Sequence, residues 1–234
     1  MLKSVATRLL RFPSPTLNTA SSRNLEELSS RLGKVGCRPL RVLNVGGGAR
    51  ALPARRVSRD VRNATIYLDI RQTPLVGVVG DALTLPFADE SMHAVLSMAV
   101  LEHLEDPVQA TQEMLRVLKP SGIVYCEVPF LQIYHAAPHD YMRFTNSGMR
   151  RLFRDFDEID QGVCAGPSSA LSWILRGYLA GLLTGFSENK RARVLAEFLA
   201  AWLTFPIKYA DHLIANRPAA SNIASACYFL GVKR

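Results

Sequence analysis

The stretch Arg41-Val-Leu-Asn-Val-Gly-Gly-Gly-Ala-Arg50 decides how the rest of the chain is interpreted. Its apolar residues predict a short buried strand from Val42 to Val45, and this strand leads directly into three glycines. Because glycine has no Cβ, the main chain of such a turn can approach a ligand closely. In a doubly wound α/β sheet, a turn of this kind lies at the carboxyl edge of the strands, where ligands bind.

The composition indicates one sizeable globular α/β domain, alone or with an added segment. The chain has 234 residues, of which 48% are hydrophobic and 21% are charged, as in folded and not in disordered chains. Its cysteines show neither CxxC nor zinc spacing, which indicates reduced thiols in a cytoplasmic compartment. The formal net charge of +8 suits an anionic surface, either membrane or nucleic acid. No basic patch interleaved with aromatic residues supports nucleic acid.

The N-terminal segment is basic. Serine and threonine are frequent there, and four basic residues precede the first acid, Glu26: Lys3, Arg8, Arg11 and Arg23. Organelle transit peptides, arms that touch phospholipid and plain surface termini share this bias, and the sequence leaves all three open. No apolar run reaches the ~18 to 20 residues of a membrane-spanning helix. We interpret residues 1–23 as a basic N-terminal arm.

Strand and helix signals alternate beyond this arm, which favours a parallel sheet with right-handed crossovers. Besides Val42–Val45, strands are predicted at residues 65–69, 75–80, 93–97, 123–128, 158–163 and 223–230. Helices are predicted over 24–34, from Asp106 to a stop at Pro120–Gly122, and over 145–156. The chain is therefore divided into the arm, a core (24–163), an apolar helical insertion (164–222) and a final strand (223–234).

Polar residues at the strand ends predict a site for a nucleoside-bearing cofactor. The glycine turn would let backbone amides approach the polar tail of such a ligand. Asp69 ends the second strand 21 residues after Gly48 (69 − 48 = 21), the spacing at which an acid accepts hydrogen bonds from two ribose hydroxyls. Asp81 would accept a hydrogen bond from a base amino group. A nicotinamide dehydrogenase would share the turn and Asp69, so these residues alone leave the cofactor open.

Three further segments narrow the choice of cofactor. They are Leu85-Pro-Phe-Ala-Asp-Glu-Ser91, Val100-Leu-Glu-His-Leu-Glu-Asp-Pro107 and Arg116-Val-Leu-Lys-Pro-Ser-Gly122. With them the chain resembles the class I S-adenosylmethionine-dependent methyltransferases, most closely the methyltransferase type 11 group, over roughly residues 40 to 160. The resemblance implies S-adenosyl-L-methionine as cofactor. It also implies a Rossmann-like seven-stranded sheet with helices on both faces and an antiparallel last strand, here preceded by the helical insertion.

The resemblance assigns residues to this cofactor. The glycines would flank its methionine portion, Asp69 would bind the ribose, and Ser97 would line the space near the methyl group. Asn44 stands where the family usually has an acid, and Arg50 stands where it has a third glycine. Either change can weaken cofactor binding, so a non-catalytic binding or assembly protein of the same fold stays open. The predicted cofactor-binding residues are Asn44, Gly46, Gly47, Gly48, Asp69, Asp81, Ala82 and Ser97.

A second polar cluster follows the fifth strand, in Tyr134-His-Ala-Ala-Pro-His-Asp-Tyr-Met-Arg-Phe-Thr145. It resembles the His-Pro-x-Asp-Tyr-x-Arg-Phe-Thr segment of methyltransferases in sugar and envelope-glycan pathways. We predict that His139 and Asp140 form a catalytic pair that takes a proton from an attacking hydroxyl. The predicted acceptor-binding residues are His135, Tyr141 and Arg143.

This segment has two other interpretations. In the first, Asp140 and Arg143 pair with each other and only hold the loop in place. The second is a metal site from His135 and His139, and it is not predicted, because Pro138 disrupts their helical spacing and no further ligand is evident.

The apolar insertion guides the prediction of the acceptor. Residues 194–205 have helical spacing and follow Lys190, Arg191 and Arg193. Such a helix can lie in an anionic lipid interface, or it can pack on the sheet or on a second copy of the chain. The predicted function is methyl transfer to oxygen or nitrogen of a small or lipid-linked acceptor, with a glycan precursor as one example. The expected location is cytoplasmic, with peripheral membrane association left open.

Overall fold

The computed structural model describes residues 12–234 except 37–38, 50, 136–137 and 188. Its contacts divide the chain into two compact units. The core unit comprises residues 20–130, 134–164 and 227–234, and the helical unit comprises residues 1–19, of which 12–19 are described, 131–133 and 165–226. Some residues named above lie outside the described residues: Lys3, Arg8, Arg11 and Arg50.

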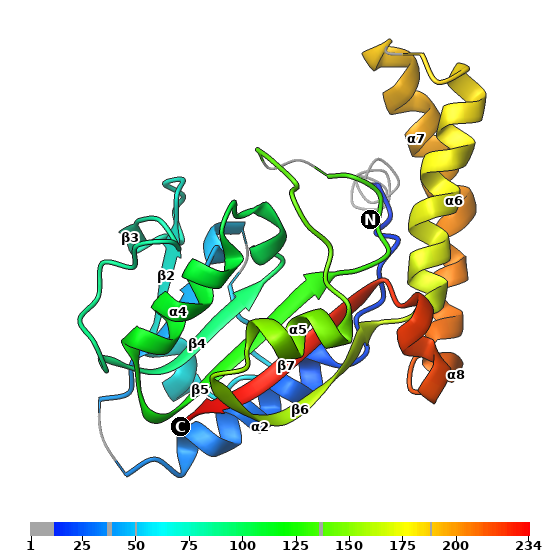
Figure 1. Ribbon diagram of the computed structural model, residues 1–234. Coiled ribbons are helices and arrows are strands. Elements are labelled where there is room, and N and C mark those ends of the chain that lie inside the picture. The colour runs from blue at the N-terminus through cyan, green and yellow to red at the C-terminus, as the bar shows by residue number, and fades with distance from the viewer. Residues whose placement is uncertain (1–11, 37–38, 50, 136–137, 188) are drawn as a thin grey trace, which may run out of the picture. The chain divides into compact units, whose positions relative to one another are not determined.

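The core unit is built on a seven-stranded sheet in the order β3-β2-β1-β4-β5-β7-β6. Strands β1 to β5 pair in parallel, and β7 runs antiparallel to β5 between β5 and β6 (Figure 1). The predicted Rossmann-like sheet with an antiparallel last strand is therefore confirmed. The strands are β1 (Val42–Val45), β2 (Thr65–Asp69), β3 (Val78–Val79), β4 (Met92–Met98), β5 (Leu118–Pro129), β6 (Phe156–Ala165) and β7 (Ala226–Lys233).

Helices cover both faces of this sheet. Tyr125 and Cys126 are consecutive in β5 and so point to opposite faces. The Tyr125 hydroxyl accepts a hydrogen bond from Asn24 Nδ2 of α2 (3.4 Å), whereas Cys126 belongs to the apolar cluster that contains Met114 of α4. The helical elements of the core unit are α2 (Ser21–Gly33), η1 (Gly47–Ala49), α3 (Arg59–Asn63), η2 (Leu101–His103), α4 (Pro107–Val117) and α5 (Asn146–Leu152).

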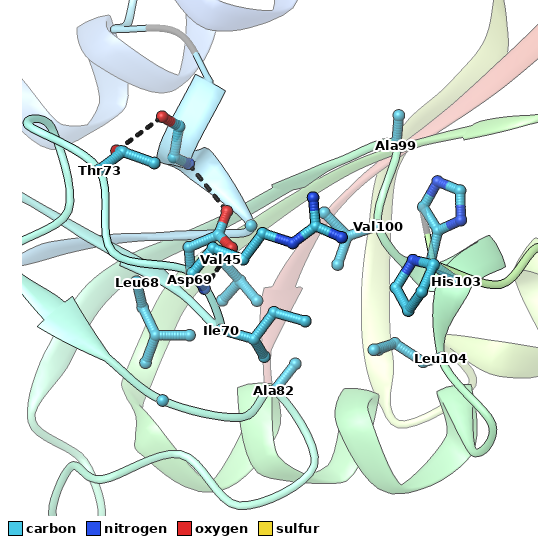
Figure 2. A pocket seen from close by; sticks show the side chains of 15 residues that line it. Val45, Leu68, Asp69, Ile70, Thr73, Ala82, Ala99, Val100, His103 and Leu104 are labelled. Carbon is cyan, nitrogen blue, oxygen red and sulfur yellow. Dashed lines mark hydrogen bonds between the residues drawn. The ribbon is translucent and has the colours of Figure 1, made fainter. Parts of the chain in front are cut away.

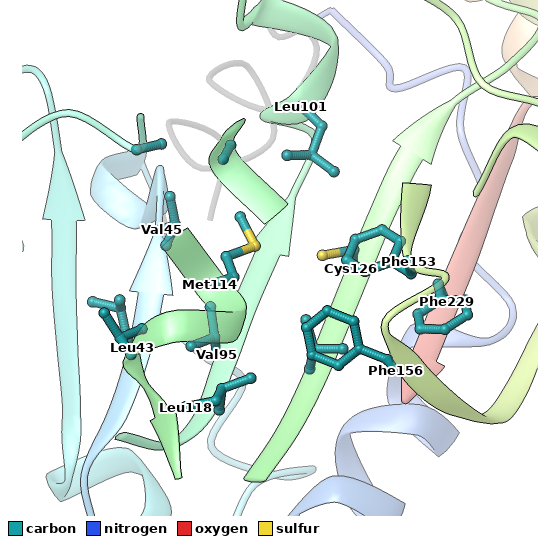
Figure 3. Close-up of a cluster of buried hydrophobic side chains, with 14 of the residues drawn as sticks. Leu43, Val45, Val95, Leu101, Met114, Leu118, Cys126, Phe153, Phe156 and Phe229 are labelled. Carbon is teal, nitrogen blue, oxygen red and sulfur yellow. The ribbon is translucent and has the colours of Figure 1, made fainter. Parts of the chain in front are cut away.

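The main apolar cluster lies between the sheet and helices α4 and α5 (Figure 3). Helix α4 begins at the predicted place, because Asp106 Oδ1 accepts the Gln109 amide (2.9 Å) and Pro107 fills the first position. The rings of Phe153 and Phe229 stack with centroids 4.7 Å apart. This packing fixes the strand ends from which the loops of the candidate site begin.

Four predicted boundaries were wrong. The last strand, predicted from residue 223, begins at Ala226, because Ile223 ends the short helix η4. The stop at Pro120–Gly122 lies inside β5, because the chain passes directly from α4 into a strand in which Leu118 pairs with Met92. Phe156, predicted to end a helix, begins β6 and is buried. β3 has only two residues, since this edge strand pairs with β2 only through Leu68 and Asp69.

The helical unit is an α-helical hairpin that is followed along the chain by shorter helices. Helices α6 and α7 lie side by side (Figure 1), and the buried Ala180, Ala196 and Ala200 form a small cluster of their own. Gly185 ends α6 in the left-handed conformation (φ 57°), and Asn189 Oδ1 caps α7 by accepting the Arg191 amide (3.1 Å). The elements are α6 (Pro167–Thr184), α7 (Lys190–Thr204), η3 (Phe205–Ala210), α8 (Asp211–Ile214) and η4 (Pro218–Ile223).

A buried carboxylate organises the start of α6. Asp211 is 1% exposed, and its two oxygens accept the backbone amides of Ser168 (2.8 Å) and Ser169 (2.9 Å) and the Ser169 hydroxyl (2.6 Å). These amides belong to the first turn of the helix, which has no intrahelical acceptors for them.

Among the described residues, no helix has the length and apolar character needed to cross a membrane.

Replacing Met114 with alanine should lower the free energy of unfolding by about 2–5 kcal/mol, because the side chain is fully buried and its loss leaves a cavity in the core. Urea denaturation followed by circular dichroism measures the change. Val108→Ala in the same helix is the matched control, since Val108 is 50% exposed and its truncation should change stability by under about 0.5 kcal/mol. Equal losses in the two variants would contradict the placement of the core.

Candidate functional site

A cavity of about 360 Å³ opens at the carboxyl ends of β1, β2 and β4 in the core unit. Figure 2 shows Asp69 and Ile70 on one side of it and Val100 and His103 on the other. The two sides come from the ends of β2 and β4, which flank β1 in the sheet. The cavity therefore lies where the glycine turn was expected to bind a ligand.

Gly46 is required at the first position of the turn. Its φ of 67° is in the left-handed region, and a Cβ added there would lie 2.3 Å from Val100 Cγ2. Its backbone amide donates to the Leu68 carbonyl at 2.8 Å. A larger residue would clash with the cavity wall and strain the backbone at the same time.

Asp69 holds the turn and still faces the cavity. Its Oδ2 accepts the Gly48 amide (3.1 Å) and its Oδ1 accepts the Arg71 amide (3.0 Å). A carboxylate can accept about four hydrogen bonds, so about two positions remain for a ligand. The amides of Gly46 and Gly48 both donate within the protein, so these two glycines provide room and not free donors.

The other predicted cofactor residues fall into two groups. Ala82 lines the cavity, while Asp81 beside it is exposed and its Oδ1 accepts the Leu83 amide (2.9 Å). Asn44, Gly47 and Ser97 are not among the lining residues of the cavity. A Cβ on Gly47 would lie 2.6 Å from Asn44 Nδ2, so the Asn44 side chain lies directly behind the turn. The binding roles of these residues stay predictions.

Asp140 and Arg143 form a bidentate ion pair. Both Arg143 amino groups donate to the Asp140 carboxylate, with Nη2 2.5 Å from Oδ2, and the His135 amide donates to the same Oδ2 at 2.8 Å. The Arg143 hydrogen bonds lower the pKa of Asp140 to about 2, helped by the His135 amide and opposed by burial. This geometry supports the interpretation in which the pair holds the loop.

The remaining residues of this segment contact the turn after β4. The Tyr141 amide donates to the Glu102 carbonyl (2.8 Å), and the Tyr141 hydroxyl donates to Glu105 Oε1 (2.9 Å). His139 is exposed, with its ring 5.3 Å from that of Tyr141 between centroids. No hydrogen bond between the His139 ring and Asp140 is found in the described part of the chain, so their catalytic pairing stays a prediction.

Two residues were missed as site residues. His103 lines the cavity, and Glu102 beside it is fully buried. His103 Nε2 and His135 Nε2 lie 3.6 Å and 3.8 Å from Glu102 Oε1. The signal was available, because Val100–Pro107 places an acid and a histidine next to each other just after a buried strand. Ile70 and Arg71 also line the cavity and had no signal of their own.

The Asp140–Arg143 pair should make stability depend on pH in the acid range. The folded pKa of Asp140 is about 2 against an ordinary 3.8, so its stabilisation is complete above about pH 4 and is lost as the pH falls toward 2. Asp140→Asn should cost about 2 kcal/mol at pH 7 and flatten the acid limb of the stability profile. Urea denaturation from pH 2 to 7 measures both effects. The control is Asp157→Asn, an exposed partner of Arg234, which should leave the profile unchanged.

Comparisons with known proteins agree with this geometry. Residues 40–126 match the family model described as a methyltransferase domain, of the type 11 group. A demethylmenaquinone methyltransferase of Clavibacter sepedonicus is 31% identical over 152 residues, covering 62% of this chain and 59% of the relative. The chain spans only about a third of the length of other relatives, such as an uncharacterized methyltransferase of Mycobacterium leprae (34% identical, 36% of this chain and 35% of the relative).

Solved methyltransferase structures share the fold. A putative sarcosine dimethylglycine methyltransferase from Galdieria sulphuraria superposes with a TM-score of 0.53 and 17% identity, covering 98% of this chain and 97% of that one. Phosphoethanolamine N-methyltransferase 2 of Haemonchus contortus, solved with S-adenosyl-L-methionine, has a TM-score of 0.53 and 15% identity, covering 92% of this chain and 53% of that one. Residues 40–126 of the chain therefore match a methyltransferase domain of the type 11 group, and the fold is that of solved methyltransferases.

Proposed function

We propose that this chain transfers the methyl group of S-adenosylmethionine to an oxygen or nitrogen atom of a small or lipid-linked acceptor. The observation that carries the proposal is the Asp69 carboxylate. It ends β2 at the cavity wall, and after accepting two backbone amides it retains room for about two further hydrogen bonds. A ribose diol supplies two donors of that kind.

The lining of the cavity fits the other parts of this cofactor. Ile70 is 59% exposed yet lines the cavity, so it offers an apolar surface to a flat base, and the small Ala82 leaves space for it. Gly46 and Gly48 leave room for the methionine portion. A volume of about 360 Å³ lies within the usual range for small-molecule sites.

In the proposed reaction the chain mainly aligns the reactants. S-adenosylmethionine supplies an electrophilic methyl group on a sulfonium. The acceptor atom forms a bond to this methyl carbon as the carbon–sulfur bond breaks, and the proton of the acceptor leaves. Asp140 is a poor base for that proton near neutral pH, because Arg143 holds its pKa at about 2. We therefore assign Asp140 and Arg143 to positioning the loop. His139, the other member of the predicted catalytic pair, has an exposed imidazole and stays the candidate base.

The name of one relative points to the acceptor class. The Clavibacter relative is named for methyl transfer to demethylmenaquinone, a quinone, and it matches more than half of this chain. A small-molecule acceptor is therefore within the proposed range. Mass spectrometry of lipid and polar extracts made with and without the protein identifies the acceptor. The expected product is heavier than its precursor by one CH₂ group.

Calorimetric titration of S-adenosylmethionine tests the cofactor assignment. Asp69→Asn should weaken binding of S-adenosylmethionine and of S-adenosylhomocysteine by about 10- to 100-fold, because both share the ribose and the variant loses the charged acceptor. Asp157→Asn removes an exposed carboxylate elsewhere in the core unit and should bind normally. If the wild-type chain binds neither compound at millimolar concentration, the non-catalytic alternative replaces this proposal.

We also propose that the helical unit contacts an anionic lipid surface, which would give access to a lipid-linked acceptor. Apolar side chains are exposed at three- and four-residue intervals along α6, namely Leu171, Ile174, Tyr178 and Leu182. The α7 residues Leu195, Leu199 and Leu203 follow the same spacing, and basic residues lie exposed at the start of that helix. Exposed apolar rows beside positive charge are the features of an interfacial helix.

The triple change Lys190→Gln, Arg191→Gln and Arg193→Gln should weaken binding to phosphatidylglycerol vesicles by about 10- to 100-fold, because each basic residue near an anionic surface contributes about 1 kcal/mol. Co-sedimentation at two salt concentrations measures it. The charge-matched control changes Arg150, Arg151 and Arg154 of the core unit. If the wild-type chain does not bind vesicles but forms a concentration-dependent dimer in sedimentation, a second copy of the chain covers the exposed apolar rows of α6 and α7 instead.

A further inference from the structure

We propose that Glu102, His103 and His135 bind a divalent transition-metal ion at the edge of the cavity. One ligand atom from each residue lies within 4.8 Å of the other two. All three belong to the core unit, and His103 also lines the cavity. The inference rests on the proposed function, because it places the metal where an acceptor would approach the cofactor. No metal site is predicted from the sequence, because Pro138 disrupts the helical spacing of His135 and His139 and no further ligand is evident there.

Glu102 is the first observation. The residue is fully buried, and neither carboxylate oxygen has a hydrogen-bond partner within the described part of the chain. Its backbone carbonyl is occupied by the Tyr141 amide at 2.8 Å, which fixes the residue in position. A buried carboxylate without donors is costly unless a cation lies beside it.

His103 is the second observation. Its Nδ1 hydrogen-bonds to the backbone carbonyl of His139, and a carbonyl can only accept, so Nδ1 carries the proton. In the neutral ring the free electron pair is then on Nε2, which lies 3.6 Å from Glu102 Oε1. Two acceptors facing each other repel unless a cation lies between them. A backbone carbonyl on one nitrogen and a metal on the other is the usual arrangement of a ligating histidine.

His135 completes the set from another loop. Its Nε2 lies 3.8 Å from the same Glu102 oxygen, and its ring packs edge-on to that of His103, with centroids 5.3 Å apart. Its Nδ1 lies 3.5 Å from Arg143 Nη2 and 3.7 Å from Asp140 Oδ2, so a metal on Nε2 requires the Nδ1 proton to face Asp140. The Asp140–Arg143 pair holds this loop through the His135 amide. These two residues are therefore positioning residues for a ligand, which gives their ion pair a purpose beyond loop stability.

The distances suit a transition metal. Two atoms bound to one tetrahedral Zn²⁺ at about 2.0–2.2 Å lie about 3.3–3.6 Å apart, and the two Glu–His distances of 3.6 Å and 3.8 Å are within a few tenths of an ångström of that separation. The two histidine nitrogens lie within 4.8 Å of each other and need to close by at most about 1.5 Å, and the half-buried His135 ring is the one free to rotate. Two imidazoles and one carboxylate are ligands for Zn²⁺, Fe²⁺ or Co²⁺, whereas Mg²⁺ prefers oxygen ligands throughout.

Three protein ligands leave a coordination position for the acceptor. A hydroxyl bound there loses its proton more readily, because the cation stabilises the oxyanion. The oxygen then forms a bond to the methyl carbon while the carbon–sulfur bond breaks, giving a methyl ether and S-adenosylhomocysteine, and the proton passes to solvent. This scheme needs no base from Asp140.

The direct test is metal binding by the full chain, measured without any methyl transfer. Purified protein is stripped with a chelator, titrated calorimetrically with Zn²⁺, and examined with Co²⁺ by visible absorption, which reports the ligands. One equivalent of Zn²⁺ should bind, and Mg²⁺ should not compete. Glu102→Gln and His135→Ala should each weaken Zn²⁺ binding by more than about 100-fold, since even outer-sphere losses cost 10- to 100-fold. His212→Ala, an exposed histidine of the helical unit, is the matched control.

The outcomes separate this inference from the proposed function. Binding of S-adenosylmethionine by the stripped protein, with no stoichiometric Zn²⁺ uptake, would overturn the metal site and leave methyl transfer standing. Zn²⁺ uptake that Glu102→Gln and His135→Ala leave unchanged would also overturn it. The alternative is that a proton, and not a metal ion, lies between Glu102 and His103. In that case adding Co²⁺ should produce no visible absorption from bound metal. If Glu102→Gln does not fold, His135→Ala decides alone, because its side chain is 32% exposed and tolerates truncation.

Discussion

The close approach of β1 to the turn after β4 is the constraint on which the site depends. Gly46 has no space for a side chain beside Val100, and its backbone requires a positive φ. This contact brings the ends of β1 and β4 together at the carboxyl edge, while Asp69 ties the end of β2 to Gly48. The cavity, the position of the Asp69 carboxylate and the loop that contains His103 all follow from the meeting of these three strand ends.

The sheet was predictable from sequence because its strands are buried apolar segments separated by helices with clear start signals. Val42–Val45 and the Asp106–Pro107 helix start were predicted at their observed positions. Boundaries failed where tertiary pairing overrides local preference, as at Pro120, where the chain enters β5 despite residues that normally end regular structure. The antiparallel last strand was predicted from the family resemblance and not from any local pattern, and the strand order comes from the structure alone.

The site was predictable only where a residue's role follows from its position in the fold. Asp69 ends a strand at a ligand-binding edge, so its place in the cavity follows from topology. The grouping of Glu102 and His103 with His135 could not be read from the sequence, because it depends on a loop that folds back from β5 onto the turn after β4. For Asp140 the sequence suggested a role that its contacts do not support. Its sequence neighbours favour a catalytic role, but its ion pair with Arg143 makes it a poor base near neutral pH.

The place of β7 has a consequence for how the chain is made. This strand is the last in sequence, after the whole helical unit, yet it lies in the sheet between β5 and β6. Until residues 226–233 leave the ribosome, the facing edges of those two long strands lack their partner, and unpaired edges are templates for aggregation. Synthesis of the helical unit lengthens that interval. The nascent chain therefore needs protection at a stage when its cofactor cavity, formed by β1, β2 and β4, can already be complete.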